Sequence, residues 1–330
     1  MNLKKAIVAT LVVSGMLAAL AGPTPAGAEA AQEKQQEQQQ AKSKEVKTDK
    51  KLAAKLQKAV KQFAGKEVKL QDAGESTSAE FAKVTSIDGK YVVHFDYKKG
   101  EVWSIDGTIP LDKVSKEIQE QVLKALKRAY AEAYPKKTYV LDKEVVLTKP
   151  YDGKKEKLKD YFSYTLTGKD FEAVWSGTGF VSAVTLKLAK EELDSKWLET
   201  AAKAVKTAFD HDLNVTAAYL YPAGENFNML SLGDNDVSLD MEAKEGTVSS
   251  VYHKTRKAVT TNQEVTEKDA KEVLAPLAKD LFNIDISGLE AKWDNEFKNY
   301  YFDKGKERVL RAALDADKNA VYIISGRFIN

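Results

Sequence analysis

The chain of 330 residues contains no cysteine, which excludes disulfide bonds, thiolate metal sites, iron–sulfur clusters and cysteine catalysis. It also lacks an excess of one charge, because 51 basic and 49 acidic residues leave a formal net charge of +2. A chain this close to neutrality lacks the basic footprint of nucleic-acid-binding proteins, so we expect no nucleic-acid partner. Its hydrophobic content of 43% is sufficient for a packed core, and its length favours about two domains at roughly 150 residues each.

The short motifs that mark common enzymes are also missing. The sequence has no H-E-x-x-H zinc motif, no G-x-S-x-G nucleophile elbow and no phosphate-binding P-loop. The three histidines, His94, His211 and His253, show no metal-ligand spacing, so we expect them in surface or packing positions. The nearest glycine-rich loop, Gly177-Thr178-Gly179, joins two expected strands, whereas a phosphate loop opens a helix. We therefore expect no catalytic residues, no metal site and no cofactor.

Two acidic clusters and four tryptophans have alternative interpretations. Asp315–Asn319 and Gly233–Asp236 contain acids but not the complete ligand spacing of a calcium loop, and they are more typical of turns. Glycoside hydrolases use a pair of carboxylates, but the presence of such pairs does not identify one here, because 49 acidic residues provide pairs in any fold. The four tryptophans, Trp103, Trp175, Trp197 and Trp293, have side chains able to stack on glycans or peptides. Trp197 lies on a helical apolar stripe, and Trp103 and Trp175 lie in or beside hairpins. We therefore expect these three to be buried.

The N-terminus has the pattern of an export signal. Lys4 and Lys5 precede a run without charge from Ala6 to Ala21, and a small-x-small pattern follows at Ala28-Glu29-Ala30. The run is short for a membrane span, so we favour cleavage after Ala30, with Ala28 second, over an uncleaved anchor. No later stretch is long and apolar enough to span a membrane. We expect a secreted or extracellular protein, in part on the cell wall, and the missing cysteine is typical of a Gram-positive host.

Residues 31–50 are rich in glutamine, lysine and acids, and we expect a disordered polar linker there. Beyond the linker, apolar residues at steps of three and four predict four helices. Stretches of alternating apolar and polar residues follow each of them, and the short turns between these stretches favour antiparallel hairpins. The helical stripes are Leu52, Leu56, Val60 and Phe63; Ile118, Val122, Leu126, Ala129 and Ala133; Trp197, Ala201, Val205, Ala208 and Phe209; and Ala270, Val273, Leu277 and Leu281, the last preceded by a cap at Thr266 and Asp269.

Each group of strands ends on a similar hairpin. A strand runs into a polar turn, then glycine or asparagine, one further residue, valine and a second strand. The turn residues are Gly100, Gly179, Gly246 and Asn319, and these residue types tolerate the left-handed backbone that such turns need. The recurrence predicts an α+β fold of tandem units, each with one helix and a small antiparallel β-sheet. The expected boundaries are 1–30 signal peptide, 31–50 linker, and units at 51–110, 111–189, 190–262 and 263–330, with paired units forming two lobes that divide near residue 190.

A helix followed by a small sheet that closes on a strand–D-x-x-x-G-x-V–strand hairpin resembles the PepSY family. Leu239–Val251 and Leu314–Ile324 match best, the first unit matches in part through Asp96, and Ser176 replaces the acid in the second. The likeness extends to bacillary exported proteins with tandem PepSY-like units. It implies action outside the cytoplasm and protein binding, in some members restraint of a peptidase, and it brings no catalytic residues.

Three functional hypotheses follow from these patterns. The first is an exported, non-enzymatic protein-binding protein that modulates a secreted peptidase, with strand addition at exposed sheet edges as a mode of contact. The alternative is a structural cell-envelope protein that binds wall polymers or surface proteins. The third, an enzyme that uses carboxylates alone, is disfavoured because no motif supports it.

Overall fold

The computed structural model describes residues 45–77, 80–151, 153, 161–223 and 227–326. The predicted signal peptide, 1–30, and residues 31–44 of the predicted linker lie outside this range. The helices are α2 Lys50–Ala64, α3 Lys116–Tyr130, α4 Ser195–Phe209 and α5 Glu267–Phe282, with the 3-10 turns η1 Leu111–Lys113 and η2 Lys190–Glu192. The strands are β1 Glu45–Lys47, β2 Ala73–Ser76, β3 Phe81–Thr85, β4 Tyr91–Asp96, β5 Glu101–Pro110, β6 Glu144–Pro150, β7 Ser163–Gly168, β8 Phe171–Ser176, β9 Phe180–Lys187, β10 Ala217–Pro222, β11 Asn228–Gly233, β12 Val237–Glu242, β13 Val248–His253, β14 Ala291–Asp294, β15 Asn299–Lys304, β16 Glu307–Leu314 and β17 Ala320–Ser325.

A side chain caps the N-terminus of each of the four described helices. The side chain of Asp49 accepts from the Leu52 amide at 2.7 Å, and side chains of Ser115 and Asp194 cap α3 and α4 in the same way. The predicted cap of α5 is confirmed as a reciprocal capping box between Thr266 and Asp269. These caps satisfy amides at each N-terminus that have no partner within the helix.

The prediction of tandem units with separate small sheets is wrong. The described strands form one sheet of 17 strands, all paired antiparallel, in the spatial order β1 to β13 and then β17, β16, β15, β14. The sheet stays continuous because the last strand of each group pairs with a strand of the next group. A separate small sheet would leave unpaired backbone amides and carbonyls along its two edges. Pairing between neighbouring groups of strands gives these amides and carbonyls hydrogen-bond partners. The predicted antiparallel hairpins are confirmed.

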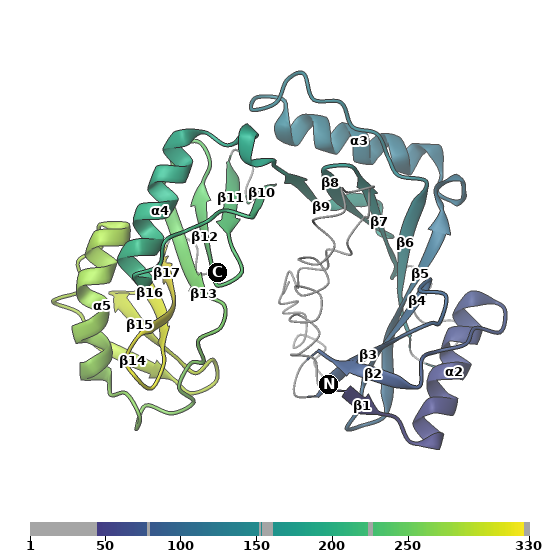
Figure 1. Cartoon of the computed structure of the whole chain (residues 1–330), viewed down its shortest axis with the longest axis horizontal. Coiled ribbons are helices and arrows are strands. Elements are labelled where there is room, and N and C mark those ends of the chain that lie inside the picture. The colour runs from purple at the N-terminus through teal and green to yellow at the C-terminus, as the bar shows by residue number, and fades with distance from the viewer. Residues whose placement is uncertain (1–44, 78–79, 152, 154–160, 224–226, 327–330) are drawn as a thin grey trace, which may run out of the picture.

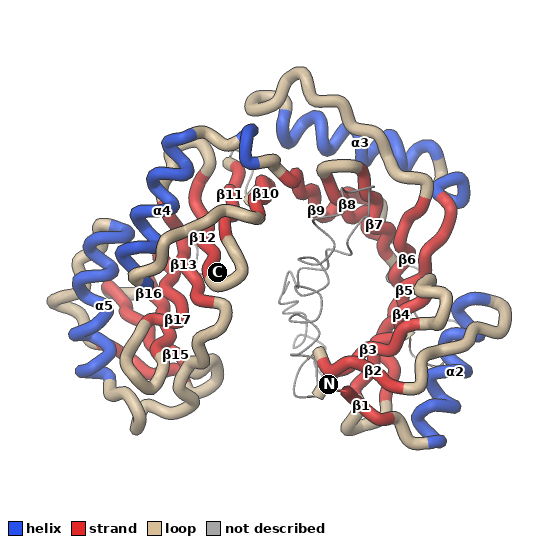
Figure 2. The backbone as a smooth tube through the Cα atoms, in the orientation of Figure 1, coloured by secondary structure: helices blue, strands red, loops and turns tan. Residues whose placement is uncertain are grey.

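The sheet curves into an arch, and the four described helices lie on its outer side (Figure 1). Figure 2 shows the same separation, with the helices outside a continuous band of strands. Apolar residues of the strands alternate toward the helices, and the polar phase lies on the opposite side. We call this opposite side the inner face. Its residues used below are Phe81, His94, Trp103, Asp106, Glu172, Tyr219, Tyr221, Ser231, Asp240, Ser250, Tyr252 and Tyr322.

The two halves of the arch meet where β9 pairs with β10 through only two register pairs, Tyr219 with Lys187 and Leu220 with Leu186. The buried ring of Tyr130 in α3 covers this seam, and its hydroxyl lies 3.0 Å from the Val184 carbonyl of β9 and 2.9 Å from the Leu220 carbonyl of β10. One buried apolar cluster extends from the second helix to the last strand, across residue 190, while α2 packs on a separate cluster with β3 to β5. The hydrophobic core therefore does not divide at the expected boundary between lobes.

Three of the four predicted turn residues have the expected left-handed backbone. Gly100, Gly179 and Gly246 have φ of 65°, 99° and 72°. In the last hairpin the prediction is wrong by one residue. Lys318 has φ of 63°, and Asn319 is not among the described residues with a positive φ. The carboxylate of Asp315 accepts from the Asn319 amide at 2.8 Å, which fixes the turn one residue earlier.

Gly246→Ala tests the conformational cost of these turns. A Cβ at this position would meet only a lysine side-chain carbon at 4.0 Å, so the cost is that of the left-handed backbone. We expect the free energy of unfolding to fall by about 1 kcal/mol in urea denaturation. Gly288→Ala is the matched control, because Gly288 has open space and no positive φ, and we expect no loss there. Equal losses in both variants would contradict the assignment.

Candidate functional site on the inner face

An aromatic cluster lies on the inner face of the first strands. The ring of Trp103 is 5.2 Å from His94 and 6.2 Å from Phe81, measured between centroids. Trp103 is 50% exposed and Phe81 is 42% exposed, so the predicted burial of Trp103 is wrong. The cause is a register shift between β4 and β5, which places Val102 in the core opposite Phe95 and turns Trp103 to the inner face.

His94 connects two strands beneath this aromatic cluster. Its Nε2 lies 2.8 Å from Oδ2 of Asp106 on β5, and both side chains are largely buried. The expected position on the polar phase of its strand is confirmed, since the neighbours Val93 and Phe95 face the core. The pair was not predicted, because a twelve-residue separation across a bulged hairpin carries no local signal. The pair fixes the position of the His94 ring, which lies beside Trp103 at an interplanar angle of 46°.

A second polar group occupies the inner face of the other half, around Asp240 at the centre of β12. Oδ2 of Asp240 accepts from the Ser250 hydroxyl at 2.8 Å, and the hydroxyls of Ser231 and Tyr221 lie near this carboxylate. Burial raises the pKa of Asp240, and the three hydroxyls offset only part of that effect. Burial and the charge of Asp240 in turn raise the pKa of Tyr221. The sequence pattern predicted only that Asp240 alternates with the core residues of its strand.

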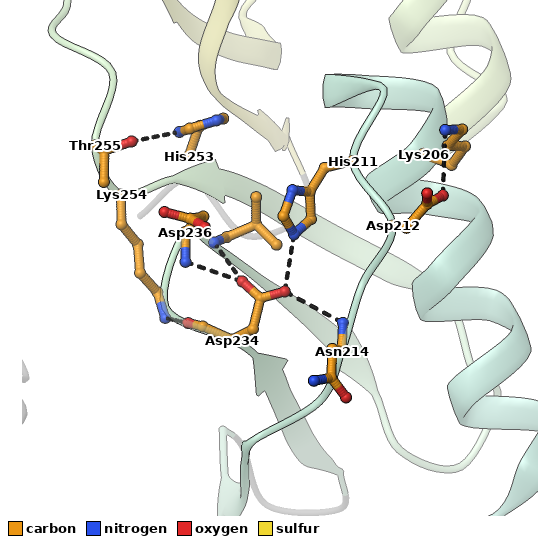
Figure 3. A network of polar contacts seen from close by, with 10 residues as sticks. Lys206, His211, Asp212, Asn214, Asp234, Asp236, His253, Lys254 and Thr255 are labelled. Carbon is orange, nitrogen blue, oxygen red and sulfur yellow. Dashed lines mark hydrogen bonds and ion pairs between the residues drawn. The ribbon is translucent and has the colours of Figure 1, made fainter. Parts of the chain in front are cut away.

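A third network joins the end of α4 to the turn between β11 and β12 (Figure 3). Asp234 accepts from His211 Nε2 at 2.8 Å and from the amides of Asn214, Asp236 and Val237. Burial opposes its ionisation, but these hydrogen bonds, led by His211, lower its pKa to about 2. The cluster at residues 233–236 is thus a turn held by its own carboxylate, as the sequence indicates.

His253 lies close to this network but contributes no ligand geometry. Its Nδ1 is 3.3 Å from the Thr255 hydroxyl (Figure 3). Its ring packs edge-on against Phe209, with centroids 5.4 Å apart. Burial lowers its pKa, and the charge of Arg256 adds to this effect. Within the described ranges, no group of three or more histidines, aspartates or glutamates is placed to hold a metal ion.

Asp234→Asn tests the structural role of the third network. The lowered pKa means that ionised Asp234 stabilises the fold above about pH 4, and that this contribution disappears as the pH falls toward 2. Allowing for solvent screening, we expect a loss of about 1–2 kcal/mol at neutral pH that shrinks in acid. Urea denaturation at pH 7 and pH 3 measures it. Asp236→Asn, at an exposed residue of the same turn, is the control, and an equal loss there would refute the assignment.

Two acids of the recurring hairpins, Asp96 and Asp315, bond to their own turns. Asp96 accepts from the amides of Lys98 and Lys99, each at 2.9 Å, and Asp315 accepts from those of Asp317 and Asn319. The hydrogen bond from the Lys99 amide is the largest cause that lowers the pKa of Asp96. Their carboxylates therefore stabilise hairpin turns, as Asx turns do elsewhere.

A shallow depression of about 540 Å³ beside Lys137 contains two acids, Asp170 and Glu192. Both pair with Lys137, at 2.7 and 3.0 Å. Burial alone would lower the pKa of Lys137, but its two carboxylate partners raise it. The depression lacks two free carboxylates, which the carboxylate-only enzyme hypothesis requires.

The remaining tryptophans belong to or pack against the core between the sheet and the helices. Trp175 is 8% exposed, which confirms its predicted burial, and its Nε1 donates to Gln121 of α3 at 2.8 Å. Trp197 packs against the same core and donates to the Ala243 carbonyl at 2.8 Å. Trp293 is half-buried beside Tyr300, with ring centroids 4.9 Å apart. Trp103 is thus the tryptophan that lies on the inner face.

Comparisons of the chain with models of protein families, with curated proteins and with solved structures gave no match. The resemblance to PepSY therefore stays a prediction. In the part of the chain that the structure describes, no helix has the length and apolar character to cross a membrane.

Proposed function

We propose that this chain is an exported, non-enzymatic protein that binds another exported protein through the inner face of its sheet. The observation that carries the proposal is the asymmetry of the sheet. The four described helices pack on the outer side (Figure 2). The inner side presents Trp103 and Phe81 with large exposed fractions. Exposed aromatic side chains on a rigid support are typical of protein-binding surfaces. A secreted peptidase is the partner that the PepSY resemblance suggests.

The geometry favours contact through the face over strand addition at an edge. Among the described residues, the edge strands are β1 and β14, with three and four residues. Lys292 and Asp294 place charges on β14. Short, charged edge strands are a common protection against further pairing. Strand addition, expected from the sequence as a mode of contact, is therefore the less favoured one.

The experiment is capture from the host's culture supernatant on immobilised residues 31–330. We expect one secreted protein to be retained, and to show reduced activity in the complex if it is a peptidase. The second column carries Trp103→Ala, so that retention on the wild-type column alone assigns the contact to the inner face. Retention of nothing, with the protein itself recovered on purified wall fragments, would refute the proposal and favour the envelope alternative.

A further inference from the structure

The group around Asp240 on the inner face is an anion without a cationic partner. The Ser250 hydroxyl donates to its carboxylate at 2.8 Å, and the neutral hydroxyls of Ser231 and Tyr221, on two further strands, lie near enough to lower its pKa. No lysine or arginine of the described ranges pairs with it. Other acids with limited exposure differ in this respect, since Asp234 pairs with His211 and Asp170 pairs with Lys137.

Tyrosines surround this carboxylate. Tyr221 lies close enough for the charge of Asp240 to raise its pKa, and Tyr252 on β13 faces Tyr322 on β17, with ring centroids 6.0 Å apart. Tyr219 lies across from Ser231, which in turn lies across from Asp240. Tyrosine hydroxyls both donate and accept, and tyrosine rings attract a cation to their faces. A carboxylate surrounded by hydroxyl oxygens and aromatic rings is the arrangement that binds an ammonium ion.

A second acid, Glu172, lies across the seam between β9 and β10. Partial desolvation raises its pKa, and its charge raises that of Tyr219, so the two side chains are neighbours. Lys187 is paired in register with Tyr219 but forms no ion pair with either acid in the described part of the chain. Two unpaired carboxylates therefore flank the tyrosines on the inner face.

We propose that Asp240, with Tyr221, Ser231, Ser250 and Tyr252, forms a binding site for a lysine side chain of the partner, and that Glu172 receives a second one. This inference rests on the proposed function, because it assigns the inner face a basic partner segment. An ammonium group is compact and carries three donors, which match one carboxylate and the adjacent hydroxyl oxygens. Asp240 on β12 and Glu172 on β8 lie on the same face of one continuous sheet, so a single extended segment that crosses β9 to β11 would contact both acids.

Isothermal titration calorimetry of residues 31–330 with the peptide acetyl-(Lys)4-amide tests the site. The control peptide carries the same residues with acetylated, uncharged side chains. We expect saturable binding of the charged peptide alone and a loss of about tenfold or more in Asp240→Asn, which keeps the side chain's shape. Glu199→Gln removes the same charge from the exposed outer side of α4 and is expected to bind as the wild type does.

The outcomes separate this inference from the proposed function. Equal losses in Asp240→Asn and Glu199→Gln, or equal binding of both peptides, would overturn the lysine site. If Asp240→Asn fails to fold, Glu172→Gln, at a solvent-exposed residue, decides with an expected loss of about threefold. Absence of binding by wild-type protein would also overturn the site. A partner captured by the wild type and lost in Trp103→Ala would leave the proposed function standing in each of these cases.

Discussion

Tyr130→Ala is expected to lower the free energy of unfolding by about 4 kcal/mol. Tyr130 is fully buried, and its ring covers the two-pair seam between β9 and β10. The substitution leaves a cavity at the junction of the two halves and removes the donor that reaches the carbonyls of Val184 and Leu220. Cavity formation in a core that relaxes only in part accounts for most of the expected loss.

Urea denaturation of purified protein measures this loss, and two variants separate its causes. Tyr130→Phe keeps the ring and removes only the hydroxyl, so we expect a loss of about 1–2 kcal/mol. Tyr161→Ala removes the same side chain at a residue that is 60% exposed, and we expect almost no change. We also expect faster hydrogen exchange at Leu186 and Leu220 in Tyr130→Ala, because these residues form the seam. A Tyr130→Ala protein as stable as Tyr161→Ala would contradict the seam's dependence on α3.

Trp103→Ala is expected to weaken partner binding by about 30-fold or more. Tryptophan is enriched among the residues that dominate binding energies, where truncation costs about 2 kcal/mol or more. Trp103 is half exposed and is supported by His94, which Asp106 holds at 2.8 Å. Such support lowers the entropy that the side chain loses on binding. The measurement is the dissociation constant for the captured partner by surface plasmon resonance.

Ile87→Ala is the matched control for Trp103→Ala. Ile87 is a large apolar residue with 68% exposure, but it lies in the turn between β3 and β4 and not on the aromatic cluster. We expect its affinity to equal that of the wild type. Thermal unfolding of both variants checks that the fold is intact, since an exposed side chain contributes little to stability. Equal affinity of Trp103→Ala and wild type would remove this residue from the binding surface.

The local elements could be predicted from the sequence because their signals are local. The stripe from Leu52 to Phe63 gives α2, and the alternation from Tyr91 gives β4. Thr266 and Asp269 mark the start of α5 correctly. The expected stripe of α5 is displaced in part, since Leu274 and Ala278 are buried beside the predicted Ala270. Tertiary packing selects which neighbouring apolar residues of an amphipathic helix face the core.

The single sheet and its inner face could not be predicted, because both depend on pairing between distant strands. The seven-residue pairing of β5 with β6 extends from Ser104 to Pro110, and no short motif encodes such a register. One signal for Trp103 was available. Val102 and Trp103 are adjacent apolar residues of one strand, and a regular strand turns adjacent side chains to opposite faces, so it cannot bury both. The bulge places Val102 on the core side.

Site-specific photo-crosslinking in the host's culture supernatant tests the use of the inner face most directly. One variant carries p-benzoylphenylalanine at Phe81 beside Trp103, and the matched variant carries it at Lys203 on the exposed outer side of α4. We predict a covalent adduct with a single exported protein from position 81 and none from position 203. An adduct from position 203 alone, or adducts with wall fragments in place of a protein, would contradict the account.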